Sequence, residues 1–188
     1  IPTNSLYNTS AFTVAFWIKL NSPEKWSGII DKGRDSNTDW YFLTGDEGTT
    51  EGVIFGAGNG STTAEVSYAW NDELWHHVAG ISNGSSITLY VDGEDKGSET
   101  IGASMSDNAI VLGSRLDNTY YMQGEIDELS IWNRALSLSE IREMMYKTRN
   151  ETEAGLVGYW PFNSGSGPVA EDQILANDGA LNNMGIKG

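Results

Sequence analysis

Two carboxylates in the second half of the chain have a spacing that bond-cleaving chemistry could use. Glu125 and Asp127 stand two residues apart in the stretch GEIDELSIW, and side chains at alternate positions of a strand share one face. A retaining glycoside hydrolase needs two carboxyl groups about 5 to 5.5 Å apart, one as nucleophile and one as proton donor. The next position on this face is Leu129 in a regular strand or Ser130 in a bulged one, neither a carboxylic acid, and Glu128 would point to the other face. We therefore predict that the chain is not an enzyme.

The two histidines do not suggest a second reactive site. His76 and His77 are adjacent, so on a strand they face opposite sides and cannot hold one metal ion together. The chain has no cysteine, and no serine nucleophile motif accompanies the histidines. We therefore expect neither histidine to be catalytic, and the family resemblance described below implies that both are structural.

Aromatic side chains offer binding rather than catalysis, because the flat apolar face of a ring matches the C–H face of a pyranose. Five aromatic residues beside expected turns are candidates for ligand binding: Trp26, Trp40, Trp70, Tyr120 and Tyr121. Core packing is the alternative for each of them. Four other tryptophans lie within apolar strand patterns and are expected in the core: Trp17, Trp75, Trp132 and Trp160.

The net charge narrows the range of partners. The 188-residue chain has 26 acidic and 11 basic residues, a formal charge of −15, so its field repels phosphate backbones and anionic lipids. We expect no nucleic acid partner and no membrane insertion, since no apolar run approaches the ~20 residues that cross a bilayer. A surplus of carboxylates suits divalent cations, and calcium is the cation we expect first.

Short strand patterns follow one another at intervals of about ten residues. They include AFTVAFWIKL, WYFLT, GVIFGAG, AEVSYAW, LWHHVAGIS, SITLYVDG and GEIDELSIW, and Asp92-Gly93 marks a tight hairpin turn. One short helix is expected after Ser137, which can cap it together with Glu140, with Ile141 and Met144 on one face. We predict an all-β fold, a two-sheet antiparallel jelly-roll sandwich with one short helix.

Several of these stretches, in this order, resemble the laminin-G-like, concanavalin A-like jelly-roll domains of extracellular bacterial and archaeal proteins. FTVAFWIKL resembles an early strand of those domains, and LWHHVAGISNGSSITLYVDGEDKGS and GEIDELSIWNRALSLSEIREMM resemble their two signature stretches. The resemblance covers most of residues 11 to 146, and we assign the domain to residues 1–150. It implies carbohydrate binding, adhesion or extracellular assembly, since this fold serves many ligands. GEIDELSIW is also similar to the catalytic strand of laminarinase-type hydrolases, whose pattern E-x-D-x-x-E ends here at Ser130, so a glycoside hydrolase is the least favoured alternative.

The same resemblance implies a calcium site. It suggests that Asp127 lies near the opening segment of the domain, where a side-chain oxygen and backbone carbonyls can hold calcium. A strand-end carboxylate that caps amides or faces solvent is the alternative. The loop EDQILANDG resembles a family loop with the pattern D-x-S-G-N-x-N-D-G and keeps Asp172, Asn177 and Asp178, although it lacks the Ser-Gly pair. These three are further candidate metal ligands.

Residues 151–188 form a C-terminal strand and loop segment. The segment contains LVGYWPF, whose apolar side chains must be buried against something. The resemblance places such a segment at the opening of a module, although here it comes last. Either this strand completes its own sandwich, or it pairs with the next module or another copy, because an unpaired sheet edge accepts a strand from a second chain.

Location and function follow from these patterns together. Sequons at Asn8, Asn59, Asn83 and Asn150 permit glycosylation, and the N-terminus IPTNSLYN, which has no signal peptide, suggests a processed or excerpted chain. We predict a secreted or surface-displayed binding or adhesion module, stabilised by calcium, that binds a glycan or a cell-surface ligand. The alternative is a structural subunit of an extracellular filament or surface layer, assembled head-to-tail from copies of itself by strand exchange.

Overall fold

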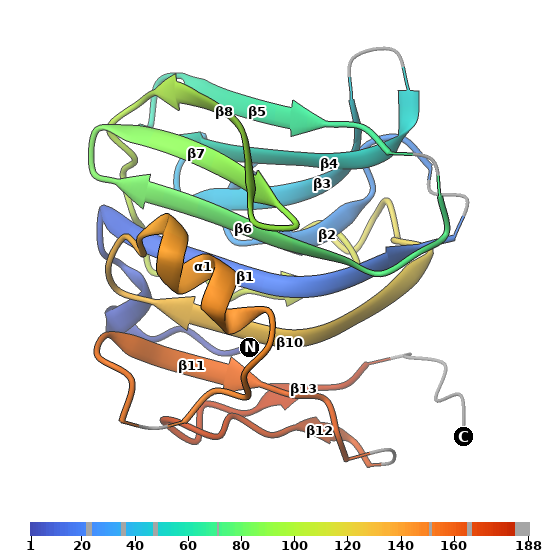
Figure 1. The fold of residues 1–188 in the computed structure, drawn as a ribbon, viewed down its shortest axis with the longest axis vertical. Helices are drawn as coiled ribbons and strands as arrows, with labels where there is room; N and C mark the ends of the chain where they lie inside the picture. Colours follow the sequence, from blue (N-terminus) through green and yellow to red (C-terminus); the bar gives the residue numbers. More distant parts are fainter. Residues whose placement is uncertain are drawn as a thin grey trace.

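A computed structural model of the chain describes residues 1–21, 24–34, 37–46, 49–70, 72–150, 152–164 and 167–182. Most of the strands form two facing sheets, and one helix lies outside them (Figure 1). In chain order the elements are the 3-10 helix η1 (Ser5–Tyr7), β1 (Ala11–Leu20), β2 (Gly28–Asp31), β3 (Trp40–Asp46), β4 (Thr49–Gly58), β5 (Thr63–Tyr68), β6 (His76–Asn83), β7 (Ser86–Val91), β8 (Glu94–Thr100), β9 (Val111–Leu112), β10 (Gly124–Trp132), α1 (Leu138–Met144), β11 (Leu156–Trp160), β12 (Val169–Ala170) and β13 (Gly179–Ala180).

The larger sheet has six strands in the order β11-β10-β1-β6-β7-β8, and the facing sheet has five in the order β5-β4-β3-β2-β9. Strands β12 and β13 form a separate pair. Neighbouring strands run antiparallel. This two-sheet sandwich with one short helix confirms the predicted fold class.

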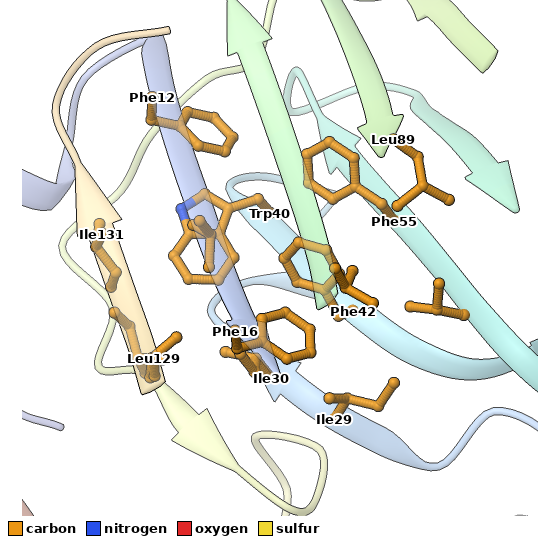
Figure 2. Close-up of a cluster of buried hydrophobic side chains, with 14 of the residues drawn as sticks. Phe12, Phe16, Ile29, Ile30, Trp40, Phe42, Phe55, Leu89, Leu129 and Ile131 are labelled. Atoms are coloured by element: carbon orange, nitrogen blue, oxygen red, sulfur yellow. The ribbon is translucent and has the colours of Figure 1, made fainter. Parts of the chain in front are cut away.

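The main core lies between the two sheets and is rich in aromatic rings (Figure 2). Phe42 of β3 stacks on Phe55 of β4 with ring centroids 4.8 Å apart, and Phe16 of β1 meets Phe42 edge-on at 5.0 Å. Each such side chain contributes roughly 1.5 to 3 kcal/mol when it leaves water. The alternation that buries them is clear in β7, where every second residue is buried.

A second apolar cluster covers the outer face of the six-stranded sheet, beneath α1 (Figure 1). Ala15 is small enough to leave room for the helix, which buries Ile141 and Met144 against the sheet. The helix begins with the predicted capping box, in which the Ser137 hydroxyl accepts from the Glu140 amide and the Glu140 carboxylate accepts from the Ser137 amide.

A bulge in β10 changes which face its carboxylates share. Ala15 of β1 pairs with Ser130 and Trp17 pairs with Asp127, so β10 has an extra residue, and Glu128 has a φ of 53°. The Glu128 carboxylate accepts a hydrogen bond of 2.5 Å from the Tyr159 hydroxyl, in the cluster on the outer face of the sheet. The prediction that Glu128 points away from Asp127 is therefore wrong, because a bulge places two consecutive residues on one side.

The C-terminal segment is held within its own chain. Strand β11 pairs with β10, with Tyr159 opposite Ser130. The other edge of β11 is also occupied, because the Tyr159 amide donates to Asp172 Oδ1 at 3.0 Å and the Tyr159 carbonyl accepts from the Gln173 amide at 2.9 Å. In this single chain the strand thus completes its own sandwich, while pairing with a second copy stays a prediction.

Candidate functional site

Exposed apolar side chains gather at one end of the sandwich. Within the described residues, six large ones lie there, and we call this surface the aromatic end: Trp26 (46% exposed), Tyr68 (36%), Leu74 (64%), Trp75 (40%), Tyr120 (52%) and Tyr121 (64%). Isolated exposed apolar residues are ordinary, whereas a group of them at one place indicates a binding surface.

The strand register brings these residues together from distant parts of the sequence. At this end, Leu20 of β1 pairs with Gly124 of β10. In the facing sheet, Gly28 of β2 forms a bridge with Tyr121, and Val53 of β4 pairs with Tyr68. Residues 24–27, 72–75 and 113–123 therefore lie on the same side of the sheets, at the right of Figure 1.

Two of the aromatic residues have a positive backbone φ, which residues other than glycine rarely adopt. Trp26 has a φ of 65° and Tyr120 a φ of 49°, and such residues cost about 1 to 3 kcal/mol each and concentrate at functional sites. Arg115 supports both, because its Nε donates to the Trp26 carbonyl at 3.0 Å and its guanidinium lies 4.0 Å from the centre of the Tyr120 ring. The Tyr120 carbonyl accepts from the Gly28 amide at 2.9 Å. These contacts hold the backbone of both residues and the ring of Tyr120 in place.

The connection before β6 is held by a histidine. His76 Nε2 lies 2.9 Å from Asp72 Oδ1, and His76 Nδ1 lies 2.7 Å from Asp92 Oδ2 in the β7–β8 turn. The Trp70 ring lies against the imidazole, with centroids 4.7 Å apart. Burial by itself lowers the pKa of His76, but the hydrogen bonds to Asp92 and Asp72 outweigh it and the pKa is raised above 6.5.

Sequence reasoning assigned both histidines a structural role and did not consider Arg115. For His76, the signal was its i, i+4 spacing from Asp72 together with the Asp-Gly turn that carries Asp92. For Arg115, no local pattern was available, since its partner Trp26 is 89 residues away.

The structure exposes some, but not all, of the five aromatic residues that were predicted to bind a ligand. Trp26, Tyr120 and Tyr121 are exposed together as described above, and Trp70 is half-buried against the main core. Trp40 is wrong as a ligand residue, because it has no exposed surface and packs beside Phe12 and Phe42 (Figure 2). The four expected core tryptophans also divide: Trp132 and Trp160 are buried, Trp17 is half-buried, and Trp75 is 40% exposed, against expectation.

Asp172 does not act as a metal ligand in this arrangement, which corrects that prediction. Its Oδ1 accepts from the amides of Tyr159 and Ile174, and its Oδ2 accepts from the amides of Leu175 and Asn177, all within 3.2 Å. Four N–H groups directed at one carboxylate leave no oxygen facing a cation.

The other two residues of this loop hold its shape. Asp178 accepts from the Asp172 amide at 2.9 Å, and the Asn177 amide donates to the Pro2 carbonyl and the Tyr7 hydroxyl. These contacts tie the loop to itself and to the N-terminus. The three residues therefore organise the fold of the C-terminal segment, while Asn177 and Asp178 as metal ligands stay a prediction.

Asp127 also stays a predicted calcium ligand. It lies on the outer face of the six-stranded sheet, opposite Trp17, and its Oδ1 accepts from the Glu128 amide at 2.9 Å. Burial and the neighbouring Glu128 raise its pKa. No cluster of three or more metal-ligating histidine or acidic side chains occurs in the described part of the chain, so a calcium ion here would depend on backbone oxygens as well.

The opposite end of the sandwich contains a buried lysine side chain, Lys32. The Lys32 ammonium, with no exposed surface, donates to Asn8 Oδ1 at 3.0 Å, to the Ser106 carbonyl at 2.6 Å and to Asp39 Oδ1. This pocket of oxygens is filled by an ammonium group.

Three of the four predicted glycosylation sites are exposed. Asn59 and Asn83 lie in turns at the end opposite the aromatic end, and Asn150 follows α1. Asn8 differs, because its side-chain oxygen binds Lys32 and its amide contacts Asp107. A glycan on Asn8 would attach at the nitrogen that contacts Asp107, whereas glycans on Asn59 and Asn83 would leave the aromatic end clear.

Two hollows lie away from the aromatic end. One of about 220 Å³ is lined by Arg34, Tyr41 and Glu65 on the five-stranded sheet. One of about 290 Å³ lies between α1 and residues 148–150, 153 and 154. Also, no helix within the described ranges is long and apolar enough to span a membrane.

Two facing antiparallel sheets with an exposed aromatic surface on the connecting loops define a lectin-like β-sandwich. The chain belongs to the concanavalin A-like lectin/glucanases superfamily, whose laminin-G-type family pattern matches residues 1–142. This confirms the resemblance found in the sequence. The protein named "Sushi, von Willebrand factor type A, EGF and pentraxin domain-containing protein 1" of Rattus norvegicus is 30% identical over 177 residues. The match covers 86% of this chain but spans only 5% of that relative.

Two solved structures share the fold at low sequence identity. A protein of Bacteroides ovatus described as carbohydrate-binding has a TM-score of 0.70 and 17% identity, over 87% of this chain and 49% of that one. Domain 4 of AbnA, a GH43 extracellular arabinanase of Geobacillus stearothermophilus solved in complex with arabinotriose, has a TM-score of 0.65 and 20% identity, over 77% of this chain and 70% of that one. At these identities the likeness shows the fold alone.

Proposed function

We propose that this chain is a non-catalytic glycan-binding module that takes its ligand on the aromatic end. The observation that carries the proposal is the exposure of Trp26, Tyr120 and Tyr121, between 46% and 64%, on loops that the fold brings side by side. Trp26 and Tyr120 also have positive φ values, a feature that concentrates at functional sites. The Tyr120 ring, held by Arg115, can bind a sugar face with little loss of side-chain entropy.

The relatives support a sugar as the ligand. The AbnA domain of the same fold was solved with arabinotriose, and the Bacteroides ovatus protein is described as carbohydrate-binding. The negative charge of the chain, −15, disfavours nucleic acid and anionic lipid surfaces as competitors. We place the module outside the cell, where modules of this family commonly work, and retain calcium at Asp127 as part of the proposal.

The carboxylates of β10 do not support hydrolysis. Glu128 shares a face with Asp127 but accepts the hydrogen bond of Tyr159, and Ser130 donates to the Ala15 carbonyl at 3.2 Å. A retaining mechanism requires one carboxyl group free to give its proton to the leaving oxygen. Head-to-tail strand exchange gains no support either, because the free edge of β11 is occupied by residues 172 and 173 of the same chain.

The test is binding of the purified chain to arabinan, mixed-linkage β-glucan and starch by affinity electrophoresis. We expect at least one of these to retard the wild type, and expect Trp26→Ala or Tyr121→Ala to weaken binding by about tenfold or more, equal to about 1.4 kcal/mol. Tyr146→Ala is the matched control, because Tyr146 is 84% exposed but lies after α1, outside the aromatic end. Equal losses in all three variants, or no binding by the wild type, would reject the aromatic end as a glycan site.

A further inference from the structure

The contacts of His76 require an imidazole that donates from both nitrogens. Asp92 Oδ2 is 2.7 Å from Nδ1 and Asp72 Oδ1 is 2.9 Å from Nε2. A carboxylate can only accept, and neutral imidazole has a single N–H. Both contacts are hydrogen bonds only while the ring is protonated, since in the neutral form one contact would set two lone pairs against each other.

The two carboxylates come from different elements, so the protonated ring joins them. Asp92 is firmly placed, because its Oδ1 accepts from the His77 amide at 2.9 Å and its own amide donates to the His77 carbonyl at 2.8 Å. Asp72 lies in the connection before β6, is 46% exposed at its side chain and also accepts from the Leu74 amide at 3.0 Å. His76 therefore fastens the connection to the rigid β7–β8 turn.

That connection carries part of the aromatic end. Leu74 is 64% exposed and Trp75 is 40% exposed, and both lie between Asp72 and His76. The Trp70 ring packs on the imidazole on one side and against the main core on the other. When the Asp72 contact is broken, the segment with Leu74 and Trp75 loses a bond that ties it to the β7–β8 turn through His76.

The other charged groups near His76 do not titrate in the same range. On the turn and β8, Glu94 pairs with Lys96 at 2.9 Å, and on α1 the Arg142 Nε donates to the Gly93 carbonyl at 2.9 Å. On β1, the residue opposite His76 is the uncharged Ile18. Carboxylates stay ionised and lysine and arginine stay protonated between about pH 5 and 8.5, so His76 is the group whose charge changes there.

We propose that protonated His76 latches the Leu74–Trp75 connection in place, and that the aromatic end binds its glycan more tightly when His76 carries a proton than when it is neutral. This inference rests on the proposed glycan-binding function and adds its regulation by pH. By linkage, the glycan must also favour the protonated ring, so the affinity ratio and the change in the pKa of His76 on binding report the same coupling.

The first measurement compares glycan affinity and the titration of His76 in the intact chain. The probe is whichever of arabinan, mixed-linkage β-glucan and starch the wild type binds most tightly at pH 5.5. We expect affinity to be about three- to tenfold higher at pH 5.5 than at pH 8.5, and the pKa of His76 from NMR to rise by about 0.5 to 1 when the glycan is added. The two histidines of the chain make the imidazole signals simple to assign.

Asp72→Asn removes the negative charge that holds the imidazolium. Asp72 Oδ1 accepts from the Leu74 amide and also contacts His76 Nε2, and one amide atom cannot both accept from Leu74 and donate to a neutral imidazole. With its oxygen kept on Leu74, the variant offers the ring only a neutral acceptor, so we expect its affinity for the glycan at pH 5.5 to fall to about the wild-type value at pH 8.5 and its pH dependence to be lost. Asp95→Asn is the matched control, because Asp95 accepts from the Gly97 amide on β8, which β7 separates from the strand of His76; it should keep the wild-type pH dependence.

Each result of these measurements either supports or rejects the latch. If affinity is the same at both pH values, or if Asp72→Asn keeps the wild-type pH dependence, the latch is rejected while glycan binding stands. If the wild type binds none of the three polysaccharides at either pH, the proposed function and the latch fall together. A pKa of His76 that does not change on glycan addition also rejects the latch, since a purely structural histidine would behave in this way.

Discussion

At the scale of single residues, buried charge has the largest consequences in this protein. Lys32 and Asp39 both have fully buried side chains, and the ammonium group also binds Asn8 and Ser106. Removing one partner of a buried ion pair leaves an uncompensated charge, which costs more than the pair itself contributes. The two partners must therefore be considered as a unit.

Lys32→Met should destabilise the protein strongly. The change keeps the length of the side chain but leaves the Asp39 carboxylate buried without its cation, so we expect a loss of about 3 to 5 kcal/mol in the free energy of unfolding. Urea denaturation measures this loss. Lys147→Met is the control, because Lys147 is 63% exposed and its pair with Glu143 is a surface pair worth about 0 to 1 kcal/mol. A similar small loss in both variants would contradict the role given to Lys32.

His77 should make stability depend on pH in the opposite direction from His76. Burial is the main cause that lowers its pKa to about 4, with Asp92 opposing the change and Arg149 adding to it. The unfolded chain, with an ordinary pKa of about 6.5, then binds more protons than the folded chain between these values, so stability is complete above pH 6.5 and is lost as the pH falls towards 4.

His77→Phe tests this dependence, because an aromatic ring can keep the edge contact with Trp17, whose centroid is 5.4 Å from that of His77. We expect the difference in unfolding free energy between the wild type and this variant to change by at most about 1.4 kcal/mol per pH unit between roughly pH 6 and 4.5. The measurement is chemical denaturation at several pH values. Parallel curves for the two proteins would show that His77 does not titrate as described.

At the scale of elements, the C-terminal loop closes the edge of the six-stranded sheet. The outward-facing amide and carbonyl of Tyr159 are bound by Asp172 and Gln173, and Pro161 follows β11 directly. An edge whose hydrogen-bonding groups are occupied does not recruit another strand. The loop therefore both completes the domain and limits association through β11.

Asp172→Ala should loosen this loop and open the edge. Four amides lose their acceptor, and since hydrogen bonds to a charged group contribute about 1.5 to 3 kcal/mol, we expect a loss of about 3 kcal/mol or more in urea denaturation. Size-exclusion chromatography with light scattering should show self-association increasing with concentration. Glu171→Ala, at an exposed neighbouring position, is the control for both measurements. A variant as stable and as monomeric as this control would show that Asp172 does not close the edge.

At the scale of the whole molecule, the two ends of the sandwich differ in kind. One end displays the aromatic surface, and the other contains the buried Lys32 network and the exposed turns with Asn59 and Asn83. Because its two ends differ in this way, the domain can be tethered or glycosylated at one end while the other end binds a ligand.

Calcium binding is a prediction about the whole fold, since an ion at Asp127 would join its side chain to backbone oxygens of other segments. A ligand that binds only the folded state stabilises it by about 2.7 kcal/mol when present at 100 times its dissociation constant. We expect thermal melting to occur at a higher temperature with millimolar calcium than with a chelator, and expect Asp127→Asn to reduce that difference. Identical melting curves with calcium and with chelator would exclude a stabilising site.

The sequence determined the features that depend on neighbours along the chain. Strand patterns, the Asp92-Gly93 turn and the Ser137 capping box all followed from local spacing, because periodicity and capping act over a few residues. The burial of Trp132 and Trp160 followed from the same alternation.

Tertiary structure alone decided which residues meet. Trp40 stands beside a turn in the sequence, but β3 carries it beneath the facing sheet, and Asp172 became a cap because the chain folds β11 beside it. Asp92 reaches His76 across 16 residues because β6 and β7 pair. Strand pairing joins positions that no local pattern relates, so the aromatic end and the histidine between two carboxylates exist only in the folded chain.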